Sequence, residues 1–303
     1  MGRAGDGDGW VVCARGHRHW GRFGAAGLLL HHRDPSGRVA VLLQHRSPLS
    51  HHGGTWSLVG GARDSGESPT DTALREAGEE ATICADVVHA AGILRDDHGG
   101  WAYHTVLAEA SHRTPAAPVG WESTDVRWVG LDDVERLSLH PGLRRTWPLL
   151  RSAMVRLTVV VEVAGTVRAA SEAGLDILLG AGLLRDRLAV LTRGGVPDDT
   201  LPSTLTRPSL GLWMPDVVLV TSEDDVEPGD EVVPNGAAGA VPVLVVTGPD
   251  GDGLVEVVRE HRVQRPGSPV LVVTADPGVR ARCAVLGAAA TGPEWLLRQV
   301  GVS

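Results

Sequence analysis

The chain has 303 residues, 43% of them hydrophobic and 21% charged, which is an ordinary composition for a globular protein with sizeable cores. Its net charge of −9 argues against nucleic acid as a partner, because general nucleic-acid binders need basic surface to neutralise phosphates. No apolar run approaches the roughly 20 residues of a membrane span, so we expect no membrane partner. Three widely spaced cysteines, an odd number, fit a reducing compartment, and we expect the protein to be cytoplasmic.

The two halves of the chain differ in composition, and the length is typical of two domains. Residues 1–150 hold 12 of the 13 His and 7 of the 9 Trp, whereas residues 151–303 are rich in Val, Leu, Gly and Pro. We therefore predict a flexible tail at residues 1–15, a first domain at 16–152 and a second domain at 153–303. The sequence leaves the oligomeric state open.

In the first half, apolar segments bounded by turn residues predict a series of strands around one long helix. The helix is expected at residues 70–81, with Ser68 or Thr70 as its N-cap, and further helical segments at 131–137 and 142–154. Strands and helices that interleave in this way predict a mixed sheet covered on two sides. The strands are expected at residues 24–31, 39–44, 56–59, 87–94, 101–108 and 126–129.

In the second half, continuous apolar, β-branched runs predict buried parallel strands. Helical segments lie between these runs, so we predict a doubly wound, mostly parallel α/β domain. The strands are expected at residues 157–161, 217–220, 243–246 and 270–274, and the helices at 183–191, 254–261, 279–286 and 294–300.

The most informative stretch of the sequence lies between residues 61 and 83. On a helix, residues three and four apart share a face, so the carboxylates of Glu76, Glu79 and Glu80 gather there and repel one another. A divalent cation would neutralise such a cluster, and oxygen ligands alone favour Mg²⁺ or Mn²⁺ over zinc. The spaced positions of the stretch are, in chain order, Gly61, Glu67, Arg75, Glu76, Glu79 and Glu80.

These positions resemble the signature of the Nudix hydrolases, a family that cleaves nucleoside diphosphates linked to another moiety. Six of the seven fixed letters of the signature are present, with Gly61 as a structural residue of the motif. At the seventh, Thr82 stands where the family has Gly, which strains the backbone if the position needs a positive φ. The resemblance covers roughly residues 10–150 and implies the Nudix α/β/α sandwich with a mixed sheet.

The resemblance also implies a metal site. The Gly60 carbonyl and the carboxylates of Glu76 and Glu80 would coordinate Mg²⁺, with Mn²⁺ as an alternative, and Glu79 would bind directly or through water. The metal would offset charge on the diphosphate and lower the pKa of a bound water, which then attacks phosphorus in line.

Two further roles follow from the resemblance. Arg75 would pair with Glu67 or Glu79 and hold that carboxylate in position, and Glu67 would act mainly as such a structural partner. The group that takes the proton of the water stays open, because Glu76, Glu79 or a loop carboxylate could serve. Glu122 is the loop candidate, although a carboxylate in a loop is more often only a solvated charge.

Residues outside the motif are weaker candidates for substrate binding. Arg46 could meet phosphate, although an Arg at a sheet edge often only reaches solvent. Trp56 and Trp101 could stack on a base, although a Trp at a strand edge is more often part of a core. The C-x₂-C pair of structural zinc sites is absent, so we expect substrate or surface contacts, and no zinc, from His17, His19, His51, His52 and His98.

The second half faintly resembles the NYN branch of the PIN-like nucleases. Acids follow its apolar strands, where open α/β sheets form their sites, and the candidates are Glu162, Asp252, Asp276 and the run Glu223-Asp224-Asp225. That family has aspartate at the position of Glu162, asparagine at Gly165 and a second acid at Gly253. We therefore predict a degenerate, non-catalytic domain.

The preferred function is Mg²⁺-dependent hydrolysis of the diphosphate linkage of a nucleoside diphosphate derivative, for instance an oxidised nucleoside triphosphate cut to monophosphate and pyrophosphate. The expected partner is a nucleotide-type small molecule. An ADP-ribose or dinucleotide pyrophosphatase is one alternative. The others are a metal-dependent ribonuclease that uses the C-terminal domain, with the Nudix half as a nucleotide sensor, and a non-catalytic nucleotide-binding regulator.

Overall fold

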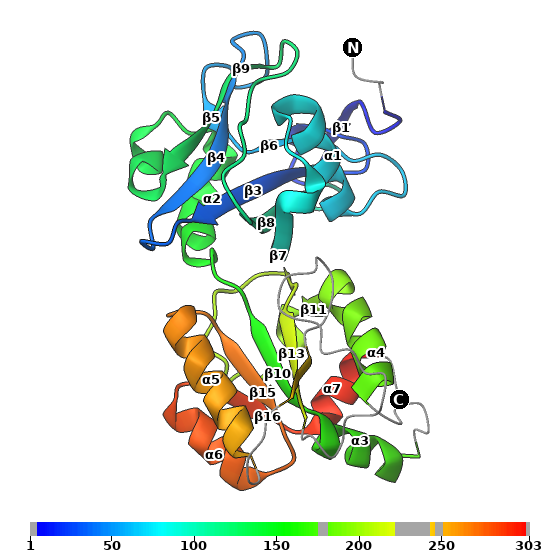
Figure 1. Ribbon diagram of the computed structural model, residues 1–303. Helices are drawn as coiled ribbons and strands as arrows, with labels where there is room; N and C mark the ends of the chain where they lie inside the picture. Colours follow the sequence, from blue (N-terminus) through cyan, green and yellow to red (C-terminus); the bar gives the residue numbers. More distant parts are fainter. Residues whose placement is uncertain (1–4, 175–180, 222–242, 246–250, 301–303) are drawn as a thin grey trace. The chain divides into compact units, whose positions relative to one another are not determined.

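The computed structural model describes residues 5–174, 181–221, 243–245 and 251–300 (Figure 1). The chain divides into two compact units. Unit 1 comprises Met1–Met154 with Pro208–Gly211, and unit 2 comprises Val155–Arg207 with Leu212–Ser303. Within the described part of the chain, no helix combines the length and the hydropathy needed to cross a membrane. The acids Glu223, Asp224 and Asp225 and the predicted strand end at Val246 lie outside the described residues.

Unit 1 contains a mixed sheet built around β3 (Ala25–Arg33). Within this unit the strand order is β7-β8-β3-β4-β5, with β6 paired to β3 and β9 paired to β4. The pairing of β3 with β8 is parallel, and the other pairings of β3 are antiparallel. The remaining strands are β4 (Val39–Arg46), β5 (Trp56–Ser57), β6 (Val59–Ala62), β7 (Val88–Asp97), β8 (Ala102–Ala110) and β9 (Ser123–Gly130).

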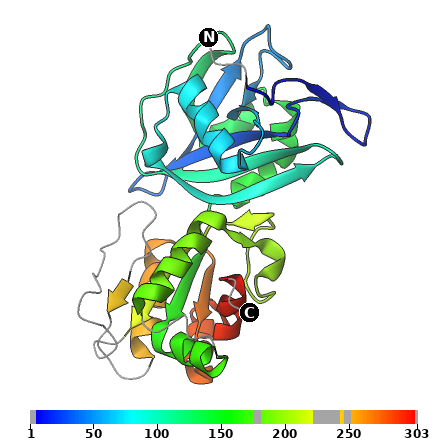
Figure 2. The ribbon, with the colours of Figure 1, turned by 90° about the vertical axis from the view of Figure 1, so that its right-hand side faces the viewer.

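Helices cover both sides of this sheet (Figures 1 and 2). Helix α1 (Pro69–Ala81) packs against β3, β6 and β8. Its buried side chains are small, namely Thr72, Ala73, Ala77 and Ala81, so the helix lies close to the strands. The other helical segments of unit 1 are η1 (Ala85–Val87), η2 (Leu131–Arg136) and α2 (Pro141–Ser152).

The N-terminal segment is more structured than expected. The sequence predicted a flexible tail up to residue 15, but β1 (Trp10–Val12) and β2 (Arg18–Trp20) form an antiparallel hairpin. Cys13, directly after β1, is only 4% exposed. The hairpin was missed because its strands have only three residues each.

Unit 2 has a five-stranded parallel sheet with the order β14-β13-β10-β15-β16. Numbered along the chain, this order is 3-2-1-4-5, as in doubly wound folds, and its direction reverses between β10 and β15. Helices α3, α4 and α7 lie on one side and α5 and α6 on the other (Figure 1). The strands are β10 (Thr158–Glu162), β13 (Asp216–Thr221), β14 (Val243–Val245), β15 (Val270–Val273) and β16 (Ala289–Thr291).

The helices of unit 2 are α3 (Val163–Glu172), α4 (Ala181–Gly194), α5 (Asp252–Gln264), α6 (Pro277–Val285) and α7 (Pro293–Gln299). The unit also contains β11 (Val196–Pro197), η3 (Asp198–Thr200) and β12 (Leu212–Trp213). The continuous apolar runs correctly predicted the parallel strands, since Val159, Val160 and Val161 of β10 are all fully buried.

Candidate active site

Helix α1 and strand β6 bring two glutamates against a glycine pair. A Cβ atom on Gly61 would lie 2.4 Å from a carboxylate oxygen of Glu76, so only glycine lets this carboxylate rest on the strand. A Cβ on Gly60 would lie 2.3 Å from the carbonyl oxygen of Ala26 in β3. The N–H of Gly60 donates to Glu80 Oε2 at 3.4 Å. Both carboxylates therefore lie beside the backbone of β6.

Arg75 connects three glutamates of the motif. Its Nε and Nη2 atoms donate to the two carboxylate oxygens of Glu67 at 2.7 and 3.0 Å. Its Nη1 atom donates to Glu76 at 2.9 Å and to Glu79 at 3.3 Å. Nη2 also donates to the carbonyl of Ala62 at 3.0 Å, which anchors the guanidinium to β6. The sequence left Glu67 and Glu79 open as partners of Arg75, and the structure shows contacts to both.

Glu67 is fully engaged by its surroundings. Besides Arg75, it accepts hydrogen bonds from the backbone N–H of Asp64 at 3.1 Å and from Thr72 Oγ1 at 2.9 Å. The hydrogen bonds from Arg75, and then those from Asp64 and Thr72, lower the pKa of Glu67 to about 2. Glu67 in turn is the main cause that raises the pKa of Arg75. This carboxylate is therefore charged and fixed in its position.

In contrast to Glu67, Glu76 and Glu80 have raised pKa values. Burial raises the pKa of Glu76 to about 7, against the lowering effect of Arg75, and Glu79 and Glu122 raise it further. Burial, Glu76 and Glu122 raise the pKa of Glu80, while the N–H of Gly60 opposes this effect. Buried like charges of this kind are costly without a compensating cation. The oxygen-only donors of Glu76, Glu79 and Glu80 fit a hard divalent cation such as Mg²⁺.

Glu122 is exposed to solvent and lies beside this cluster. Its charge raises the pKa of Glu80 and of Glu76. The physical reason is a long-range contact, because the N–H of Val119 donates to the carbonyl of Glu80 at 2.9 Å. This bond holds the loop that precedes β9 over the end of α1. Glu122 is exposed and also lies near Glu80, so both interpretations of this residue stay open.

The candidates for substrate contact are already engaged by the protein. Trp56 is 8% exposed, and the guanidinium carbon of Arg127 lies 4.4 Å from the centre of its ring. Trp101 stacks on His19 with ring centroids 3.9 Å apart and donates to the carbonyl of Gly21. Both indoles thus make packing contacts of the kind the core interpretation predicts. Arg46 donates from Nε to the carbonyl of His51 at 3.0 Å.

Tyr103 is a residue near the glutamate cluster that the sequence analysis did not consider. It lies on β8, and a Cβ on Gly27 would lie 2.1 Å from its hydroxyl oxygen. Burial raises its pKa, and the nearby charges of Glu80 and Glu76 add to the effect, whereas Arg46 opposes it. The neutral hydroxyl therefore lies within electrostatic reach of both glutamates. The available signal was that Tyr103 is the single tyrosine of the chain.

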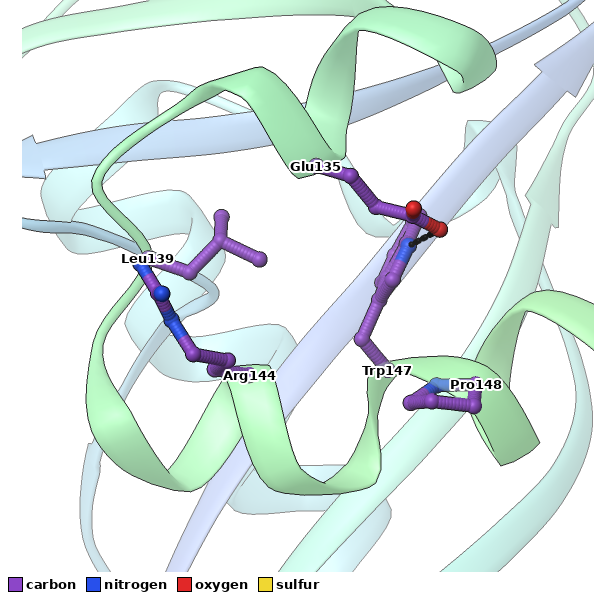
Figure 3. Close-up of a pocket in the computed structure, with 5 residues that line it drawn as sticks. All are labelled: Glu135, Leu139, Arg144, Trp147 and Pro148. Carbon is purple, nitrogen blue, oxygen red and sulfur yellow. Dashed lines mark hydrogen bonds between the residues drawn. The ribbon is translucent and has the colours of Figure 1, made fainter.

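A pocket in unit 1 lies away from the motif residues. It is formed by η2, the following segment and α2, and its lining residues are Glu135, Leu139, Arg144, Trp147 and Pro148 (Figure 3). Its volume of about 280 Å³ is below the range of about 300–1,000 Å³ of typical ligand pockets. The indole N–H of Trp147 donates to Glu135 at 3.2 Å across it. None of the predicted site residues lines this pocket.

In unit 2, the three candidate acids take part in structural contacts. Asp276 caps α6 by accepting from the N–H groups of Gly278 at 2.6 Å and Val279 at 3.1 Å. Asp252, at the start of α5, forms an ion pair with Arg282. The carboxylate of Glu162 accepts from the hydroxyl of Thr274. The resemblance of this half to nucleases stays a prediction.

Comparisons with known proteins place the chain among the Nudix proteins. Residues 22–150 match the NUDIX domain. A Mycobacterium tuberculosis protein provisionally named 8-oxo-dGTP diphosphatase 3 is 49% identical over 155 residues, which span 49% of this chain and 71% of that protein. A nucleoside triphosphate pyrophosphatase/Nudix hydrolase fusion protein of Bifidobacterium longum is 47% identical over 146 residues, spanning 47% of this chain and 30% of the fusion protein.

Among solved structures, the chain is similar to RenU, a Nudix hydrolase from M. smegmatis. The identity is 46% and the TM-score is 0.46, with coverage of 48% of this chain and 93% of that chain.

Proposed function

Since the chain belongs to the Nudix hydrolase family, we propose that it is a Mg²⁺-dependent enzyme that cleaves the diphosphate linkage of a nucleoside diphosphate derivative. The observation that carries the proposal is the pair of largely buried carboxylates of Glu76 and Glu80, which α1 places against β6 beside Glu122. Closely spaced carboxylates raise one another's pKa, and a bound cation offsets their repulsion. The same cation would also offset the negative charge of a diphosphate substrate.

Three glutamates would hold the ion. Glu76 and Glu80 offer carboxylate oxygens next to Gly60, and Glu79, on the same helix, is half exposed. When bound, Mg²⁺ supplies charge that offsets the diphosphate and lowers the pKa of a coordinated water. Mn²⁺ has a similar preference for oxygen ligands and is expected to substitute.

The remaining residues position the glutamates and take the proton of the attacking water. Arg75 is fixed by its two-point contact with Glu67 and orients Glu76 and Glu79. Glu122 is the carboxylate of the cluster that comes from a loop. We propose that it acts as the general base and accepts the proton of the attacking water. A new bond forms between the water oxygen and phosphorus, the bridging phosphorus–oxygen bond breaks, and the leaving phosphate carries the electron pair.

For the substrate we propose an oxidised purine nucleoside triphosphate, cut to the monophosphate and pyrophosphate. The support is the similarity to the M. tuberculosis relative that carries the name of an 8-oxo-dGTP diphosphatase. The motif residues handle only the diphosphate and the ion, so the choice of base depends on the surrounding loops. The ADP-ribose and dinucleotide pyrophosphatases are the alternatives that the experiment must separate.

The test is a nucleotide panel with Mg²⁺ that measures phosphate and pyrophosphate release. It contains canonical and 8-oxo nucleoside triphosphates, ADP-ribose, NADH and dinucleoside polyphosphates. Glu79→Gln and Glu80→Gln are expected to lower kcat at least about 100-fold, because each removes a charged oxygen from the site. Glu172→Gln, on an exposed position at the end of α3, is the matched control. Unchanged rates in both site variants would remove these residues from the chemistry.

A further inference from the structure

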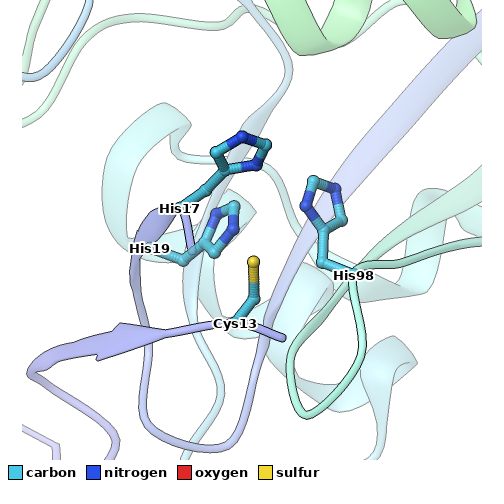
Figure 4. Close-up of side chains that lie close together, drawn as sticks. All are labelled: Cys13, His17, His19 and His98. Atoms are coloured by element: carbon cyan, nitrogen blue, oxygen red, sulfur yellow. The ribbon is translucent and has the colours of Figure 1, made fainter. Parts of the chain in front are cut away.

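We propose that Cys13, His17, His19 and His98 form a binding site for one Zn²⁺ ion. One ligand atom from each of the four side chains lies within 4.8 Å of all the others. Figure 4 shows the sulfur of Cys13 and the three imidazole rings directed toward one another. The sequence argument against zinc considered only neighbours in the chain and overlooked this group, because His98 is contributed by a distant loop.

Two buried nitrogen atoms of the cluster lack the partners that buried polar groups normally have. Within the described residues, His98 Nδ1 and His19 Nε2 are buried, and neither atom has a hydrogen-bond partner. His98 is only 9% exposed, so water does not reach this ring freely. A metal ion at the centre of the cluster would satisfy both nitrogens.

The second nitrogen of His98 has the partner that metal-binding histidines usually have. His98 Nε2 lies 3.3 Å from a carboxylate oxygen of Asp96, which leaves Nδ1 to face the cluster. A carboxylate behind a ligating imidazole fixes the tautomer and the ring orientation and increases the basicity of the ligand. Arg145 forms an ion pair with the same carboxylate and holds it in place.

The backbone around the cluster is tied together independently of any ion. In the turn after β1, the N–H of Cys13 donates to the carbonyl of His17 at 3.0 Å. The N–H of Ala14 donates to the carbonyl of Gly99 at 2.8 Å, which joins this turn to the loop between β7 and β8. His19 is held by its stacking on Trp101. The four ligands therefore come from a preformed arrangement of two segments.

The donor set selects the metal. A thiolate with three imidazoles favours Zn²⁺, whereas Mg²⁺ prefers oxygen ligands. A tetrahedral zinc ion with bonds of about 2.0–2.3 Å holds its ligand atoms roughly 3.3–3.8 Å apart, so closing the shell requires shifts of no more than about 1.5 Å. Four protein ligands fill the shell, and Cys13 is buried, so the site is structural and leaves no open position for a substrate.

A second histidine group in unit 1 is a weaker candidate. His51, His52 and His140 also lie within 4.8 Å of one another, but they offer three ligands, and the first two are exposed. His140 Nδ1 already accepts from the N–H of Gly142 at 3.1 Å as the cap of α2. This group serves as the internal comparison for the test.

The experiment uses the full chain, stripped with a chelator and titrated with Zn²⁺ against a chromogenic competitor. We expect one tightly bound ion per chain and a thermal midpoint that rises with zinc concentration, because the ion binds the folded state. With Co²⁺ in place of Zn²⁺, the spectrum should show a thiolate-to-cobalt charge-transfer band. Wild-type protein without this band, or with no tight zinc uptake, would overturn the proposal.

Variants assign the ligands. Cys13→Ser should abolish the charge-transfer band, whereas Cys84→Ser, at an exposed cysteine, should keep it. His98→Gln should weaken zinc binding about 100-fold or more, and Asp96→Asn by roughly the 10–100-fold typical of partners behind a ligand. His52→Ala should leave binding unchanged. Loss of binding in His52→Ala with retention in His98→Gln would move the site to the other group and contradict the proposal.

The zinc site is separable from the proposed active site. Glu80→Gln is expected to bind zinc like the wild type, because none of the four ligands belongs to the glutamate cluster. Should Cys13→Ser fail to fold, the cobalt spectrum of the wild type and the His98→Gln titration still decide the question.

Discussion

At the scale of single residues, Arg75 gives the glutamates around it different electrostatic surroundings. It holds Glu67 by two hydrogen bonds, so this carboxylate stays charged inside the protein. It gives Glu76 only one, at 2.9 Å, and burial dominates the pKa of that group. The guanidinium thus supports the site from one side and leaves the face toward Glu80 and Glu122 without compensation.

This arrangement makes a prediction about pH. The pKa of Glu67 is about 2 in the folded protein and 4.5 by its ordinary value. A lowered pKa contributes stability that is fully present above about pH 4.5 and is lost as the pH falls toward 2. Glu67→Gln should therefore reduce the free energy of unfolding at pH 7 by about 1–3 kcal/mol, with a smaller difference from wild type at pH 3.

Denaturant unfolding of both proteins at several pH values checks this expectation. Glu172→Gln, at an exposed position of α3, is the control and should leave the curve within about 0.5 kcal/mol of wild type. A deficit of Glu67→Gln that stays constant from pH 7 to pH 3 would show that the charge of Glu67 is not what stabilises the protein.

At the scale of elements, the end of α1 carries strain. Thr82 has φ 58° and ψ 26°, so the β-branched residue sits in the left-handed conformation that the family fills with glycine. The conditional expectation of strain from the sequence is therefore met. The N–H of Ile83 still donates to the carbonyl of Ala77 at 3.1 Å, so the helix ends in the usual way despite the threonine.

Thr82→Gly should stabilise the protein by about 1 kcal/mol, because relief of the left-handed strain outweighs the added freedom of the unfolded chain. The free energy of unfolding measured in urea checks it. Ala153→Gly, at the cap of α2 with φ −92°, is the matched change and should destabilise instead. Equal effects of the two substitutions would show that backbone conformation does not decide the outcome.

The same elements show where sequence reasoning succeeds and where it stops. Helix α1 was predicted within one residue of its observed start, because the cap at Ser68, the proline after it and the helical spacing are all local signals. The position of Glu122 was not predictable, since it depends on the hydrogen bond from Val119 to the end of α1. His98 joins Cys13 for a similar reason, through the contact of Ala14 with Gly99.

At the scale of the whole molecule, the two units differ in how far their candidate sites can be predicted from the sequence. In unit 1 most residues of the proposed site lie on one helix and one strand, so a linear motif captures most of that site. In unit 2 the strand order places the ends of β10 and β15 at the reversal point, where doubly wound sheets form their sites. Predicting that meeting point requires the strand order, which the four apolar runs did not provide. Strand β16 was missed because it has only three residues.

We propose that unit 2 has no nuclease activity, because Asp276 at this reversal point is occupied as the cap of α6. The full chain should leave a labelled RNA intact with Mg²⁺ or Mn²⁺. Asp276→Ala should instead destabilise the protein by about 1 kcal/mol, and Asp276→Asn, which can still cap, by less. The measurements are gel analysis of the RNA and unfolding in urea. Metal-dependent cleavage that disappears in Asp276→Asn would make unit 2 an active nuclease, since the amide retains the cap and loses only the charge that a metal ion needs.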